Sequence, residues 1–65
     1  MTTQFHQVIG FRVEIDGVLR VFHDRREIAL GMANNLKKLN KHAKVEIACV
    51  TTGKRIEMLE DGRIA

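Results

Sequence analysis

An alternating segment near the start of the chain, followed directly by a turn dipeptide, constrains the fold more than any other feature. Residues 9–16 alternate between apolar and polar with a period of two, which is typical of a β-strand with one buried face. The apolar residues that share this face are Phe11, Val13 and Ile15. Asp16-Gly17 comes next and strongly favours a hairpin, so residues 18–23 are predicted to return as a second strand.

The length of this hairpin loop decides which residues of the second strand share the apolar face, because a one-residue slip moves every side chain to the other face. A two-residue loop would bring Arg20 to the apolar face. A three-residue loop, with Gly17 in a left-handed conformation, instead brings Leu19 and Val21 there, and we expect this longer loop. The opposite, outer face would then carry Arg12, Glu14, Val18, Arg20 and Phe22.

A helix is predicted after the hairpin. Asp24 and Glu27 have the spacing of a capping box, which favours a helix start at this point. The apolar residues that follow recur at helical spacing and form a narrow stripe, namely Ile28, Met32, Leu36, Leu39 and Ala43. Leu30 lies about 160° from the centre of this stripe, which predicts an exposed position on the helix.

The last third of the chain predicts a second hairpin that turns at Thr52-Gly53. A two-residue turn there pairs Cys49 with Ile56 and Ile47 with Met58, so both strands present apolar residues on one face. The expected core consists of Phe11, Val13, Ile15, Leu19, Val21, Ile28, Met32, Leu36, Leu39, Val45, Ile47, Cys49, Ile56 and Met58.

The predicted order β-β-α-β-β defines an α+β fold in which two antiparallel hairpins form one sheet with a single helix packed on one face. We expect residues 1–65 to make a single small domain. Whether the two hairpins join within one chain or through a second chain stays open at this point.

Composition narrows the classes of function. The chain has 65 residues, of which 45% are hydrophobic and 29% are charged, as in an ordinary globular protein. Its apolar runs are too short for a membrane span, its start has no secretory pattern, and its one cysteine cannot form an internal disulfide, so we expect a cytoplasmic protein. A chain this short buries only about 60% of its unfolded surface, which favours a partner or a second copy.

The net charge of +3 comes from one local cluster of lysines at the predicted end of the helix. Its members are Lys37, Lys38, Lys41 and Lys44. They are either a solvated helix end that complements the helix dipole or a set of phosphate contacts. The alternative function is therefore nucleic-acid binding, through these lysines or through arginines on the outer sheet face, which are Arg12, Arg20 and Arg55.

Catalytic and metal chemistry are not expected. His6, His23, His42 and Cys49 lack the short paired spacing of a zinc site and fall on different elements. Cys49 is predicted on the core face, whereas a catalytic thiol needs partial exposure. We expect no enzyme activity, no cofactor, no metal and no small-molecule substrate.

Apolar residues at exposed positions point instead to protein binding. Val8, Val18 and Phe22 are expected on the outer sheet face, and the predicted protein-binding residues are Val18, Arg20, Phe22 and Leu30. The leading hypothesis is a small non-enzymatic interaction module, either a homodimer or a regulator or inhibitor that docks on a larger protein. Small chains without a cofactor motif are common among such regulators from phage and mobile elements, an association that rests on size alone.

Overall fold

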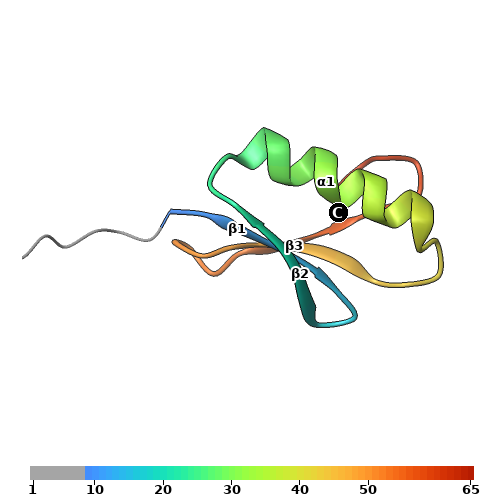
Figure 1. Ribbon diagram of the computed structural model, residues 1–65, viewed down its shortest axis with the longest axis horizontal. Coiled ribbons are helices and arrows are strands. Elements are labelled where there is room, and N and C mark those ends of the chain that lie inside the picture. The colour runs from blue at the N-terminus through green and yellow to red at the C-terminus, as the bar shows by residue number, and fades with distance from the viewer. Residues whose placement is uncertain (1–8) are drawn as a thin grey trace, which may run out of the picture.

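The computed structural model describes residues 9–65, and His6 and Val8 therefore lie outside the described residues. The elements are β1 (Phe11–Ile15), β2 (Val18–His23), α1 (Arg26–Leu39), β3 (Val45–Cys49) and β4 (Arg55–Met58). The four strands form one antiparallel sheet in the order β2-β1-β3-β4, and α1 lies across one of its faces (Figure 1). The α+β prediction is confirmed, and the two hairpins join within the chain through β1 and β3.

The first hairpin turns in two residues, so the predicted three-residue loop is wrong. Ile15 pairs directly with Val18 across the turn. Asp16 and Gly17 both have positive φ, at 50° and 82°, which is the conformation of a type I′ turn. This turn matches the twist of the flanking strands, and Gly17 adopts it without steric strain.

A β-bulge then corrects the register that the short turn sets. The pairing of β1 with β2 skips Arg20, so that Val13 faces Val21 as the core requires. Because cross-strand partners share a face, Val18 points to the helix side with Ile15, and Leu19 points to the open side with Glu14. The faces predicted for Val18 and Leu19 are therefore both wrong.

The second hairpin has a longer loop than predicted, at residues 50–53. Ile47 pairs with Ile56 and Val45 with Met58, a shift of two residues from the expected register. An even shift leaves every side chain on its predicted face, so the apolar face of this hairpin is as expected. The N–H of Gly53, whose φ is 75°, donates to the Cys49 carbonyl at 2.8 Å and closes the loop.

The helix begins one residue later than a cap at Asp24 would place it. Arg25 is the N-cap residue and makes no side-chain capping bond. Its N–H donates instead to Nδ1 of His23 at 3.1 Å, and the Asp24 carboxylate lies 3.1 Å from the same ring nitrogen. The predicted capping box is wrong, because Asp24 contacts the end of β2 and not the first turn of the helix.

The buried face of α1 is rotated by about 100°, one residue step, from the predicted stripe. Ala29, Ala33 and Lys37 form the buried row, and Leu30 and Leu36 pack beside it against the core. Two residues that the sequence pattern placed in the core, Ile28 and Leu39, are exposed. The alanines allow the helix to approach the sheet closely, which the larger residues of the predicted stripe would prevent.

The core lies between α1 and the sheet. Its buried apolar cluster consists of Val13, Ala29, Ala33, Val45, Ile47 and Met58. Partly buried residues pack around this cluster, namely Phe11, Ile15, Val21, Leu30, Leu36 and Ile56. Within residues 9–65, no helix is long and apolar enough to cross a membrane.

Candidate functional site

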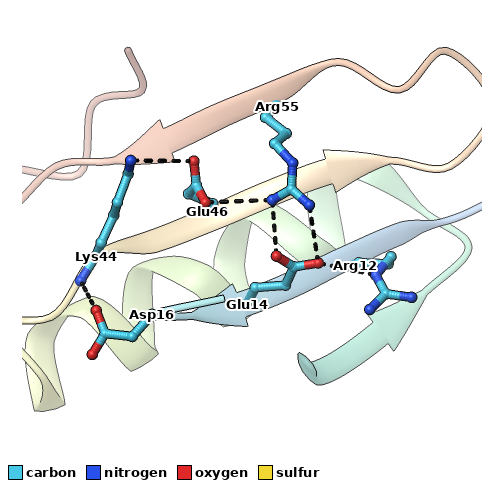
Figure 2. Close-up of polar contacts among 6 residues, drawn as sticks. All are labelled: Arg12, Glu14, Asp16, Lys44, Glu46 and Arg55. Atoms are coloured by element: carbon cyan, nitrogen blue, oxygen red, sulfur yellow. Dashed lines mark hydrogen bonds and ion pairs between the residues drawn. The ribbon is translucent and has the colours of Figure 1, made fainter. Parts of the chain in front are cut away.

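The face of the sheet opposite α1, which we call the open face, is organised around one buried carboxylate. Glu14 lies in the middle of β1 and is buried. Its Oε2 accepts a hydrogen bond from Nε of Arg12 at 3.0 Å, and its Oε1 accepts one from Nη1 of Arg55 at 2.8 Å (Figure 2). Two guanidinium groups from β1 and β4 therefore meet at a single carboxylate between them.

The network continues to β3 and the first turn. Nη1 of Arg55 also donates to Oε1 of Glu46 at 3.3 Å, and Nζ of Lys44 lies 3.8 Å from Oε2 of the same carboxylate. The backbone N–H of Lys44 donates to Oδ1 of Asp16 at 3.0 Å, which ties β3 to the hairpin turn (Figure 2). Arg55 thus lies close to two carboxylates, Glu14 of β1 and Glu46 of β3, which are direct cross-strand partners.

The surroundings of Glu14 favour its charged form. Hydrogen bonds from Arg55 first and Arg12 second lower the pKa of this carboxyl below its ordinary value of 4.5, while burial acts in the opposite direction. Buried carboxylates cost free energy unless they are paired, so both arginines are needed to keep Glu14 ionised in the sheet.

The residues predicted to bind nucleic acid do not form one surface. Arg12 and Arg55 are exposed but engaged with Glu14. Lys37 is buried, and its Nζ donates to the Ala43 carbonyl at 2.6 Å, so its predicted exposure is wrong. The helix ends at Leu39 and the chain folds back, which brings this carbonyl over the lysine. Only Lys38, Lys41 and Lys44 of the lysine cluster are exposed.

The edge strand β2 carries three exposed apolar side chains, two of them on the open face. Val18, Leu19 and Phe22 expose 55%, 44% and 48% of their surface, although Val18 points to the helix side at the end of the hairpin. Arg20 occupies the bulge between them and is also exposed. We call Val18, Leu19, Arg20 and Phe22 the β2 surface.

The Phe22 ring lies over Gly10, on the same face as Arg12. A Cβ on Gly10 would lie 2.0 Å from Cζ of Phe22, so the ring in this position requires glycine beneath it. The Gly10 carbonyl accepts a hydrogen bond from the Val50 N–H at 3.0 Å, which places the exposed Val50 beside this position. The packing on Gly10 fixes where the exposed part of the ring lies.

Leu30 is not part of an exposed helix surface. It is half-buried and packs against the core cluster, so the prediction that it lies on the solvent face of the helix is wrong. The rotation of the helix face accounts for this placement, because Leu30 follows the fully buried Ala29. Of the four predicted protein-binding residues, Val18, Arg20 and Phe22 all lie on β2, but Val18 points to the helix side and Phe22 to the open face.

The predicted metal-ligand candidates do not gather. Within residues 9–65, no group of three or more His, Cys, Asp or Glu side chains could hold a metal ion. Cys49 is half-buried at the end of β3. Hydrogen bonds with the side chain and backbone of Thr52 lower the pKa of its thiol, and the charge of Lys54 contributes in the same direction.

Comparison with known proteins adds no family: no family model matches the sequence, and no match was found among curated proteins or solved structures. The account of function therefore depends on the geometry of this chain alone.

Sequence analysis missed Leu19 as a surface residue and Gly10 as the support of Phe22. The hydrophobic character of Leu19 favoured the core, but the two-residue turn places it opposite Glu14 on the open face. Gly10 takes a non-apolar position of the alternation, and a glycine within a strand pattern was the one available indication of a close contact.

Proposed function

We propose that this chain is a non-enzymatic protein–protein interaction module that binds a second copy of itself through the β2 surface. The observation that carries the proposal is the set of three large apolar side chains, each exposed by 44–55%, on one edge strand. Exposed apolar patches of this kind are typical of interaction sites.

The two edges of the sheet differ, which supports β2 as the contact strand. The edge of β4 is covered by the end of the chain, since Glu57 and Ala65 exchange backbone hydrogen bonds of 3.0 and 2.9 Å. Within residues 9–65, the edge strand β2 has β1 as its one neighbouring strand. The bulge and the charge at Arg20 interrupt this edge, so we expect contact through side chains and not through a continuous sheet.

Charge balance supports a second copy as the partner. The open face carries the cations Arg12, Lys44 and Arg55 and the carboxylates Glu14, Glu46 and Glu57, and the β2 surface adds the exposed Arg20. Two copies therefore meet with charges of both signs and not with one sign alone. The core is small and rich in alanine and valine, so burial of leucine and phenylalanine at a dimer contact adds stability that one copy lacks.

The test is sedimentation velocity over a wide range of protein concentration, with Leu19→Asp as the variant. Leu19 is preferred to Phe22 because Phe22 also covers Gly10, and its replacement would disturb the sheet. We expect a dimer for the unmodified chain. Leu19→Asp should weaken association, with a dimer dissociation constant at least about tenfold higher, because burial of a leucine contributes about 1.5–3 kcal/mol.

The matched control is Ile64→Asp, which introduces the same charge at an exposed apolar residue beside β4. This variant should dimerise as the unmodified chain does. A chain that stays monomeric at every concentration would contradict self-association, and a regulator or inhibitor that docks on a larger protein would then be the better proposal.

Nucleic-acid binding is the second candidate, supported by the exposed Lys38 and Lys41 at the end of α1. Two or three phosphate contacts predict that log affinity falls with log salt at a slope of about −2 to −3. Fluorescence anisotropy with labelled DNA and RNA measures this slope. Our leading proposal predicts no saturable binding, because Arg12 and Arg55 are engaged with Glu14.

A further inference from the structure

A cavity on the helix side of the sheet, separate from the β2 surface, has the features of a ligand site. It has a volume of about 320 Å³ and lies between the start of α1 and the loop that joins β3 to β4. This volume is at the lower end of the range for small-molecule sites. Its lining residues are Phe11, Arg26, Leu30, Ile47, Cys49, Thr52, Lys54 and Ile56.

The cavity is apolar in its interior and cationic at its rim. Leu30, Ile47 and Ile56 belong to the core or pack against it, and they present aliphatic surface to the cavity. Arg26, the first residue of α1, and Lys54, in the hairpin loop, are both exposed at the rim. An apolar interior beneath two positive charges complements a molecule with an apolar body and an anionic end.

The two rim cations differ from the arginines of the open face in having no carboxylate partner. Arg12, Arg55 and Arg63 each form an ion pair. Among residues 9–65, no carboxylate pairs with Arg26 or Lys54, and no Asp or Glu lines the cavity. The positive charge at this rim is therefore free to pair with a ligand.

We propose that this cavity binds a small amphipathic carboxylate, with its aliphatic chain against Leu30, Ile47 and Ile56 and its carboxylate between Arg26 and Lys54. This site is independent of the proposed dimer, because it faces the helix and not the β2 surface. The cavity can therefore bind its ligand whether or not the chain dimerises, and the chain can dimerise whether or not the ligand binds.

The experiment uses octanoate as the probe and Cys49 as the reporter. Cys49 is the one cysteine of the chain and lines the cavity, so a bound ligand should slow its alkylation by the uncharged reagent iodoacetamide. We expect saturable protection by octanoate and much weaker protection by octylammonium, which has the same chain and the opposite charge. Dimer formation is monitored in the same samples by sedimentation.

The variants Arg26→Gln and Lys54→Gln test the rim directly. Each variant replaces an exposed residue, and circular dichroism checks that the fold is kept. We expect each to weaken octanoate binding about two- to fivefold, and the double variant about tenfold, because ion pairs at a surface contribute modestly. Lys41→Gln, an exposed lysine outside the cavity, is the matched control and should bind octanoate as before.

Three results would overturn the proposal: no saturable protection by octanoate, equal protection by octanoate and octylammonium, or unchanged affinity in the double variant. Methyl resonances of Leu30, Ile47 and Ile56 provide an independent readout, since octanoate should shift them and leave Ile64, outside the cavity, unchanged.

Discussion

Glu14 is a buried carboxylate on the open face of the sheet, and two arginines stabilise its ionised form. Arg55 and Arg12 lower its pKa from the ordinary value of 4.5. A group whose folded pKa is depressed contributes stability that is complete above its unfolded pKa. That stability is lost as pH falls through the folded pKa.

We therefore predict that Glu14→Gln destabilises the fold by about 1–3 kcal/mol at neutral pH, the usual range for charged hydrogen bonds. As pH falls through the lowered folded-state pKa of Glu14, the stabilities of the variant and the unmodified chain should converge, since both then have a neutral residue at this position. Urea unfolding between neutral pH and about pH 3 measures the difference. Glu60→Gln, at an exposed glutamate, is the control, and an equal pH dependence in all three proteins would contradict the role of Glu14.

Gly10 lies beneath the ring of Phe22, and single and double variants at these two positions test the contact. Gly10→Ala places a Cβ 2.0 Å from the ring, so the ring must move away. We expect a loss of about 1–3 kcal/mol, as for other overpacked sites. In a Phe22→Ala background the same Gly10→Ala change should cost far less, and a double-mutant cycle of unfolding free energies measures this coupling. Additive losses would show that the ring does not depend on Gly10.

For the helix, the sequence pattern predicts that the element exists but not which of its faces is buried. The 3.6-residue period predicts that α1 exists, but the phase of its buried face depends on how closely it approaches the sheet. Ala29 and Ala33 allow a close approach, and Leu39 is left 81% exposed. The strands show the same limit, because alternation predicts both hairpins while the bulge at Arg20 reflects a conflict between turn geometry and core packing.

The β2 surface was predicted only in part, because alternation in the sequence does not fix the length of the turn or the place of the bulge. Phe22 was placed correctly, because the three-residue loop and the two-residue loop with a bulge give it the same face. Val18 and Leu19 lie between the turn and the bulge, where the two alternatives differ, so periodicity alone could not place them. The rim of the cavity was not predicted, because Arg26 and Lys54 are distant in sequence and meet only in the folded chain.

Gly31 gives a direct test of the helix. It lies in the interior of α1, is exposed, and an added Cβ would meet no atom within 4 Å. Gly31→Ala should stabilise the protein by about 1 kcal/mol, or raise the melting temperature by about 4–8 °C. Gly17→Ala is the contrasting control, since that site is also open but has a φ of 82°, and it should destabilise. A lower melting temperature for Gly31→Ala would contradict this placement of the helix.

The fold as a whole has a small core on one side of a four-stranded sheet and an open face on the other. One edge of the sheet is covered by the end of the chain, and the other presents Leu19 and Phe22 to solvent. Arg12, Arg55, Glu14 and Glu46 on the open face pair with one another, whereas Leu19 and Phe22 at its β2 edge stay exposed. This asymmetry is the basis of our proposal that the chain associates with a second copy through β2.

The most direct test of self-association is a dilution series of amide NMR spectra recorded on the unmodified chain. If the β2 surface is the dimer contact, the largest concentration-dependent shifts will occur at residues 18–23, and those at β4 will stay small. Spectra that do not change with concentration, or changes confined to the lysines at the end of α1, would contradict the account.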